Sequence, residues 1–159
     1  MRVALLAALA TLIVGCTGPD LESDPAVELG TGEVAFESLQ DGDALPLVSG
    51  LQGGRHIWGA VRVVGIDWRE VSLVFTLEDE DGVQLTDTTT MFTELQACEL
   101  DSPGCAQGMG ELVGATILVT EEDAGAVVGG DVVLRVEAAD AAGRTASTQR
   151  SVDVTFSLN

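Results

Sequence analysis

Two cysteines, Cys98 and Cys105, are the first residues of this chain whose type and spacing point to chemistry. Six residues separate them, and this segment contains the turn dipeptide Pro103-Gly104, which can bring the two sulfurs together. An even pair of cysteines in an oxidising compartment is expected to form a disulfide. A metal pair or redox pair is the alternative, but the usual two-residue spacing and a second pair are both missing. We therefore predict a structural disulfide between Cys98 and Cys105.

A group of acidic residues suggests a second kind of chemistry, the binding of a hard cation. Glu78, Asp79 and Asp81 lie just before Gly82, and clustered carboxylates are the ligands that calcium prefers. Their order differs from that of an EF-hand loop. A solvated hairpin tip explains the same residues without a ligand. Calcium binding at Glu78, Asp79 and Asp81 is therefore an alternative hypothesis.

The single histidine, His56, lies two residues before Trp58. If residues 55–64 form a β-strand, His56 and Trp58 share one face, whereas apolar residues such as Ile57 and Val61 share the other. The two rings would form an amphipathic pair of the kind found at contact surfaces. The simpler alternative is that Trp58 covers a sheet edge while His56 bonds a nearby turn. Carboxylate partners for a metal at His56 cannot be located, so we predict neither a metal nor a cofactor.

Motifs for catalysis are missing from the sequence. It contains no Gly-x-Ser-x-Gly elbow, no His-Glu-x-x-His motif, no phosphate-binding loop and no lysine, which removes the common nucleophilic and metallopeptidase chemistries. Two carboxylates acting as a glycosidase acid and base stay open as a hypothesis. A small sandwich, however, offers little room for a deep cleft. The sequence predicts no catalytic residues and no enzyme.

Alternation of apolar and polar residues recurs from residue 33 onward, which is typical of half-buried β-strands. The clearest runs are 71–78, 132–139 and 151–158. Further candidate strands are 34–39, 44–48, 55–64, 83–87, 89–97 and 112–120. Glycine-containing turns separate them, and helical periodicity is not seen. The sequence therefore predicts eight or nine short strands.

The last predicted hairpin makes the fold more specific. Residues 132–140 alternate, an Asp-x-x-Gly turn runs from Asp140 to Gly143, and a return strand follows. This arrangement resembles the closing hairpin of bacterial immunoglobulin-like domains. The resemblance implies an all-β fold, a single immunoglobulin-like β-sandwich of about seven to nine antiparallel strands. The chain lacks a core tryptophan flanked by an intersheet cysteine pair, so an antibody-type domain is not implied.

The N-terminal residues resemble the signal peptide of bacterial lipoproteins. Arg2 precedes an apolar run, residues 3–14, which is shorter than the roughly 20 apolar residues that a spanning helix needs. The four residues that end at Cys16, Ile-Val-Gly-Cys, resemble a lipobox. The resemblance implies cleavage before Cys16 and lipidation of this cysteine, and several acyl chains anchor a protein stably. An ordinary cysteine near a simple cleavage site is the alternative.

The predicted organisation has three parts. Residues 1–15 are the signal peptide, residues 16–32 are the lipidated cysteine and a flexible acidic tether, and residues 33–159 are the sandwich. The tether is assigned because residues 17–32 are rich in proline, glycine and acidic residues.

The charge of the chain is strongly negative. It has 26 acidic residues against 7 basic ones, all arginine, for a net charge of −19. Such a surface repels phosphate backbones and anionic lipid headgroups, so it excludes nucleic-acid binding and electrostatic membrane docking. Attachment to a membrane is therefore expected through the lipid on Cys16.

Together these features predict a lipid-anchored protein of the bacterial cell envelope, with the outer membrane as the expected location. Its sandwich is expected to be a non-catalytic binding module for an unknown protein or glycan partner. One alternative is a calcium-dependent adhesive domain. Another is a small envelope hydrolase, which would require His56 to face a serine and a carboxylate in a deep pocket.

Replacement of the lipobox cysteine tests the predicted anchor. In cells that make the full chain, Cys16→Ala is expected to abolish labelling by a radioactive fatty acid and to release the protein from the membrane fraction, because the acyl chains are its only attachment. Cys98→Ala lies outside the lipobox and should be labelled like the natural protein. Continued labelling of the Cys16→Ala protein would refute the lipobox interpretation.

Overall fold

Strand pairing divides the chain into two β-sheets that pack face to face. The structure is a computed structural model and describes residues 18–50 and 54–157. Cys16 and the rest of the lipobox, residues 51–53 of the loop before His56, and Leu158 lie outside the described residues. The strands are β1 (Ala26–Thr31), β2 (Glu37–Ser38), β3 (Asp43–Ser49), β4 (Arg55–Val64), β5 (Val71–Asp79), β6 (Thr89–Thr93), β7 (Gln96–Ala97), β8 (Gly110–Val119), β9 (Asp131–Asp140) and β10 (Thr145–Phe156).

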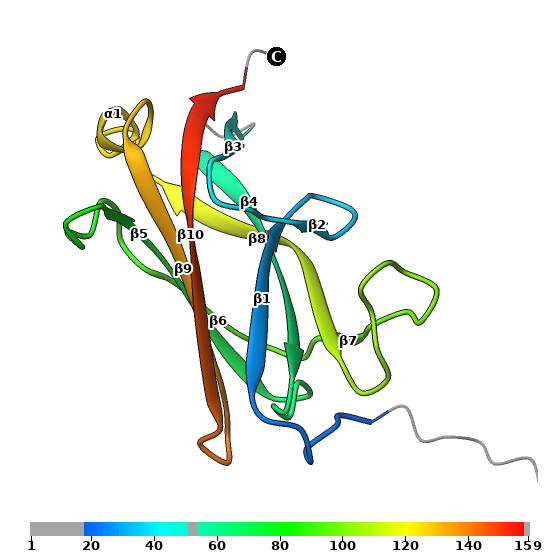
Figure 1. The fold of residues 1–159 in the computed structure, drawn as a ribbon. Helices are drawn as coiled ribbons and strands as arrows, with labels where there is room; N and C mark the ends of the chain where they lie inside the picture. The colour runs from blue at the N-terminus through cyan, green and yellow to red at the C-terminus, as the bar shows by residue number, and fades with distance from the viewer. Residues whose placement is uncertain (1–17, 51–53, 158–159) are drawn as a thin grey trace, which may run out of the picture.

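The order of the strands defines an immunoglobulin-like sandwich. Sheet A contains β2, β1, β4, β8 and β7, and sheet B contains β10, β9, β5 and β6 (Figure 1). The chain crosses from sheet A to sheet B between β4 and β5, returns between β6 and β7, and crosses again between β8 and β9. Such crossovers between two sheets are those of an immunoglobulin-like fold, so the predicted all-β sandwich is confirmed, although the described residues form ten strands where about seven to nine were expected.

Strand β3 belongs to both sheets and closes one side of the sandwich. Residues 43–47 pair with β10 in sheet B, and Val48 and Ser49 pair with β4 in sheet A. The pairing of β3 with β10 is parallel, so the prediction of antiparallel strands alone is wrong. A parallel pair arises here because both strands enter the sandwich from the same end, which sequence alternation does not encode.

Alternating apolar residues build the core between the sheets, as predicted for β5 and β9. On β5, Val71, Leu73, Phe75 and Leu77 are buried. The inward residues of β9 are Val132, Leu134, Val136 and Ala138, and β4 contributes Ile57, Val61 and Val63. Each of the valine, leucine, isoleucine and phenylalanine side chains contributes about 1.5–3 kcal/mol by leaving water. The core therefore fixes the register of both sheets, and with it the residues on their outer faces.

The predicted tether is wrong over its second half. Ala26–Thr31 form β1, which pairs with β4, and Leu29 is fully buried opposite Val61. The backbone is fixed even earlier, because the Asp20 amide donates to the Gly108 carbonyl at 3.1 Å and the Asp20 carbonyl accepts from the Gly65 amide at 3.1 Å. This strand has only six residues, and the flanking prolines, glycines and acidic residues gave the whole segment the composition of a tether.

Three of the predicted strands differ from those in the structure. Residues 83–87 form only an isolated bridge between Gln84 and Glu78, because the Asp79 carboxylate accepts the amides of Asp81 and Val83 and turns the chain out of the sheet. Residues 89–97 divide into β6 and β7 around buried Leu95, where the chain changes sheets. Of residues 34–39, only Glu37–Ser38 pair.

One helical turn, α1 (Ala124–Val127), was not expected from the sequence. It buries Ala124 and Val127 over the core. Within the described ranges, no helix has the length and apolar character that a membrane span requires.

The predicted Asp-x-x-Gly turn between β9 and β10 is present and depends on the buried Asp140 carboxylate. Its Oδ1 accepts the amides of Ala142 and Arg144, both at 2.9 Å, and its Oδ2 accepts the amide of Asp67 at 3.0 Å. Burial raises the pKa of Asp140, but hydrogen bonds from these amides, with the charge of Arg144, outweigh it and hold the pKa below its ordinary value. The ionised carboxylate therefore joins the β4–β5 connection to the last hairpin.

Neutralisation of Asp140 is expected to destabilise the fold. Asp140→Asn keeps the size of the side chain but replaces one acceptor oxygen by a donor, so the free energy of unfolding should fall by about 1–3 kcal/mol at pH 7. Because the folded-state pKa is lowered, the difference between the two proteins should shrink as the pH falls below about 4. Urea unfolding at pH 7 and pH 3 measures both effects. Asp153→Asn, at an exposed position on β10, is the control; equal effects of both substitutions would contradict this role of Asp140.

Candidate functional site

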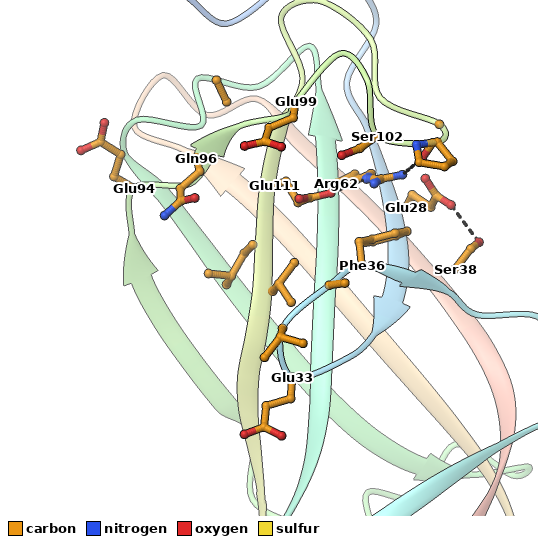
Figure 2. Close-up of a pocket in the computed structure, with 17 residues that line it drawn as sticks. Glu28, Glu33, Phe36, Ser38, Arg62, Glu94, Gln96, Glu99, Ser102 and Glu111 are labelled. Carbon is orange, nitrogen blue, oxygen red and sulfur yellow. Dashed lines mark hydrogen bonds and ion pairs between the residues drawn. The ribbon is translucent and has the colours of Figure 1, made fainter.

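A groove of about 920 Å³ lies on the outer face of sheet A, across β1, β4 and β8. The loop of residues 32–36 and the disulfide loop of residues 98–105 form its walls, as Figure 2 shows. We call it the Arg62 groove. Its lining consists of Glu28, Glu33, Val34, Ala35, Phe36, Ser38, Arg62, Glu94, Gln96, Ala97, Glu99, Ser102, Pro103, Gly104, Glu111, Leu112 and Val113.

Arg62 is buried at the floor of this groove, with only 5% of the residue exposed. The strand registers place Glu28 of β1 and Glu111 of β8 directly beside it on either side. Its Nε donates to Glu111 Oε2 at 2.6 Å, and its Nη1 donates to the Pro103 carbonyl at 2.7 Å. A buried guanidinium requires such partners. The charge of Arg62 is therefore satisfied within the protein.

Phe36 covers the same guanidinium from the loop of residues 32–36. The Arg62 Cζ lies 4.0 Å from the centre of the Phe36 ring, which is a cation–π geometry. The loop can fold onto the sheet because Gly32 has a positive φ of 116° and its carbonyl accepts from the Gly114 amide at 3.0 Å. A side chain at position 32 would collide with the Ala35 carbonyl. One wall of the groove thus depends on a glycine.

The loop closed by the disulfide between Cys98 and Cys105 forms the other wall, and this disulfide confirms the predicted pairing. The two Cα atoms are 5.6 Å apart, and Pro103-Gly104 lies in the turn, as expected. Gly104 approaches Arg62 so closely that a Cβ there would lie 2.9 Å from Nη1. The disulfide therefore closes the loop that presents the Pro103 carbonyl to Arg62.

Cys98, Cys105 and Glu111 are also the residues whose possible ligand atoms lie within 4.8 Å of one another. The two sulfurs, however, are bonded to each other, and Glu111 is paired with Arg62. A metal needs deprotonated thiolates with free lone pairs. The oxidised protein therefore offers this group no metal-binding chemistry.

The lining of the groove is strongly acidic. It contains five glutamates and one arginine, Arg62. Glu111 is paired with Arg62. The remaining glutamates are Glu28, Glu33, Glu94 and Glu99. Glu28 accepts the hydroxyl of Ser38 at 2.8 Å. Val34, Leu112 and Val113 add an apolar component. This arrangement suits a ligand that carries positive charge or hydrogen-bond donors together with apolar surface.

His56 and Trp58 lie where the sequence predicted, on the outer face of β4. Their ring centres are 4.4 Å apart in a T-shaped arrangement, and both side chains are half-buried. Among the described residues, His56 Nε2 is buried without a hydrogen-bond partner. Neither ring lines the Arg62 groove. His56 therefore does not face a serine and a carboxylate in this hollow, as the hydrolase hypothesis requires.

The predicted calcium ligands do not converge. Glu78 pairs with Arg135 at 3.3 Å, and one oxygen of Asp79 accepts the amides of Asp81 and Val83 at 3.0 and 2.8 Å. Glu78, Asp79 and Asp81 do not form a group with metal-ligand spacing in the described structure. Their observed role is to close the turn that follows β5.

Sequence reasoning missed Arg62 and its partners. The same two-residue alternation that placed His56 and Trp58 on one face places Arg62 there as well, within an otherwise apolar run. An arginine flanked by valines in a central strand was the available signal. Glu28, Phe36 and Glu111 come from distant segments: the strand register brings Glu28 and Glu111 beside Arg62, and the fold of the loop after β1 brings Phe36 there.

Comparisons with known proteins add little to this geometry. No family model matches the chain, and no match was found among curated proteins. Among solved structures, the chain is similar to the CooA pilin subunit from enterotoxigenic Escherichia coli, with a TM-score of 0.32 and 15% identity. The alignment covers 80% of this chain and 99% of the pilin subunit.

Removal of the buried cation is expected to destabilise the protein. Arg62→Met keeps an apolar stem of similar length but leaves Glu111 and the Pro103 carbonyl without their donor, so the free energy of unfolding should fall by about 1–3 kcal/mol. Arg69→Met breaks an exposed pair with Asp67 and should cost less than about 1 kcal/mol. Urea unfolding measures both variants. Equal losses would mean that Arg62 has no special structural role.

Proposed function

We propose that this protein is a lipid-anchored binding module of the bacterial cell envelope, which holds its partner in the Arg62 groove and performs no chemistry of its own. The Arg62 groove is the observation that carries the proposal. It combines charged, aromatic and apolar side chains in one hollow of about 920 Å³.

The construction of the groove supports a binding role. Both walls are held by contacts that do not involve a ligand: the disulfide closes one loop, and Phe36 and the Gly32–Gly114 hydrogen bond hold the other. A binding surface that is already ordered loses less conformational entropy when it binds its partner. The groove is therefore suited to reversible binding.

The charge of the lining favours a cationic partner. Glu28, Glu33, Glu94 and Glu99 have no basic partner among the ion pairs of the described residues. A basic peptide segment or a protein surface rich in lysine and arginine would match this potential, whereas an acidic glycan would be repelled. We therefore infer a protein partner with an exposed basic segment.

A lipid on Cys16 would hold the sandwich close to the membrane. The backbone of Asp20 is hydrogen-bonded to the backbones of Gly65 and Gly108. Only four residue steps separate Cys16 from Asp20. At about 3.5 Å per step the connection spans at most roughly 14 Å. The partner would then be met near the bilayer, at the outer membrane of the envelope.

Site-specific crosslinking tests the groove as the binding site. A photo-crosslinking residue at Val34, which is 91% exposed in the groove wall, is expected to capture a partner protein in the native envelope. The same residue at Val83, 59% exposed at the β5–β6 turn, is the matched control. Only the Val34 position should yield the product.

Charge reversal in the lining gives the second arm of this test. Glu94→Lys combined with Glu99→Lys should lower the yield of the crosslinked product formed from position 34 by at least about tenfold, because a cationic partner would then meet like charges. Glu121→Lys and Glu122→Lys, outside the groove lining, should leave it unchanged. Capture at Val83 with equal yield, or insensitivity to the groove charges, would overturn the proposed site.

A further inference from the structure

Two sulfurs and a carboxylate come together at one wall of the Arg62 groove. The sulfurs of Cys98 and Cys105 and a carboxylate oxygen of Glu111 lie within 4.8 Å of one another, and Cys98 Sγ is 3.7 Å from Glu111 Oε2. In the oxidised protein the sulfurs are bonded to each other. Reduction of this bond would leave two thiols beside a carboxylate, and these are groups that zinc accepts as ligands.

Backbone contacts hold both cysteines in place independently of the bond between their sulfurs. The Cys98 amide donates to the Met109 carbonyl at 2.9 Å, directly after the pairing of β7 with β8. The Cys105 amide donates to the Ser102 carbonyl at 3.1 Å. In the same loop, the Pro103 carbonyl accepts from the buried arginine of the groove. The two side chains therefore stay close to each other and to β8 when the sulfurs are reduced.

The spacing of these groups matches a tetrahedral zinc site. With Zn–S distances of about 2.3 Å and Zn–O distances of about 2.0–2.2 Å, a sulfur and an oxygen on one zinc ion lie roughly 3.5–3.7 Å apart. The observed distance from Cys98 Sγ to Glu111 Oε2 is 3.7 Å. Two zinc-bound sulfurs lie about 3.8 Å apart, a separation that the Cα atoms of Cys98 and Cys105, 5.6 Å apart, allow. Water would fill the remaining position.

The charge of the surroundings favours a divalent ion. The two thiolates and Glu111 carry one negative charge each, and the Arg62 guanidinium, which donates to Glu111 Oε2 at 2.6 Å, carries one positive charge. A dication therefore neutralises the group, whereas a monovalent ion leaves a charge without compensation. Carboxylates that bind metals are usually hydrogen-bonded by a neighbour in this way. Among divalent ions, thiolates select zinc over magnesium and calcium.

The group can be reached from solvent. Cys105 is half-buried and the Glu111 side chain is 21% exposed, whereas Cys98 lies deeper, with 7% of the residue exposed. Glu111 lies next to Arg62 inside the groove (Figure 2). The groove therefore provides a path for a small ion, and Cys105 is the sulfur that a reductant can reach.

We propose that Cys98, Cys105 and Glu111 bind one Zn²⁺ ion when the disulfide is reduced. A dithiol transfers two electrons and two protons to the two sulfurs, which breaks the S–S bond and oxidises the dithiol to its own disulfide. Zinc then replaces the two thiol protons, which pass to water. The disulfide and the zinc site are thus alternative states of the same residues. This inference does not rest on the proposed binding of a partner in the Arg62 groove.

Zinc binding by the purified full chain in its two redox states tests this site. The chain is reduced with dithiothreitol, freed of the reductant without air, and titrated with zinc in the presence of excess magnesium, which occupies exposed carboxylates. Equilibrium dialysis should find one zinc ion per reduced chain and none per oxidised chain. Replacement of zinc by cobalt should add the near-ultraviolet absorption of thiolate-to-cobalt charge transfer.

Single substitutions test each kind of ligand in the reduced chain. Glu111→Gln should weaken zinc binding at least about tenfold. Cys105→Ser should also remove most of the cobalt absorption, because one thiolate is lost. Glu99→Gln is the matched control, because Glu99 lines the same groove but lies outside the group of possible ligands. The Glu99→Gln protein should bind zinc like the natural chain.

Circular dichroism of the reduced proteins separates loss of a ligand from loss of the fold, since each should keep its β-sheet spectrum. Equal zinc binding by the oxidised and reduced chains, absence of the cobalt absorption, unchanged affinity of the Glu111→Gln protein, or an equal loss in the Glu99→Gln protein would each overturn the zinc site. Unfolding of the natural chain on reduction would also contradict it, because the site requires the backbone contacts of both cysteines.

Discussion

The burial of the Arg62 charge is the constraint on which the outer face of sheet A depends. A guanidinium that leaves water must recover its hydrogen bonds inside the protein, and here the partners come from three separate segments. Glu111 lies on β8, Pro103 in the disulfide loop and Phe36 in the loop after β1. The three segments meet at this point because each satisfies part of the same cation. The walls and the floor of the groove are thus parts of one polar network.

The two outer faces of the sandwich distribute their acidic residues differently. Sheet A presents a hollow with glutamates on both walls, whereas the outward acidic residues Glu137, Asp131 and Asp153 of sheet B lie at separate positions along β9 and β10. Both faces belong to a chain of net charge −19. The gathering of glutamates in one hollow therefore distinguishes the face of sheet A as the one suited to a basic partner.

Sequence patterns predicted what depends on local periodicity. The alternation of Leu73, Phe75 and Leu77, the turn at Gly143 and the Cys98–Cys105 pairing are all present in the structure. Features set by contacts between distant segments were missed or wrongly predicted. Leu29 joins the core only because β1 pairs with β4, and Arg62 becomes part of a site only when the register places Glu28 and Glu111 beside it. Spacing along the chain does not contain this information.

The parallel pairing of β3 with β10 has a consequence for how the protein is made. Residues 43–47 find their partners only in residues 152–156, more than 100 positions later in the chain. Contacts of such long sequence separation form slowly, because the loop between them must be closed first. Residues 43–47 therefore have no partner in sheet B until residues 152–156 have been synthesised. Before that point β3 can pair only through Val48 and Ser49 with β4, so sheet B gains this strand later than sheet A does.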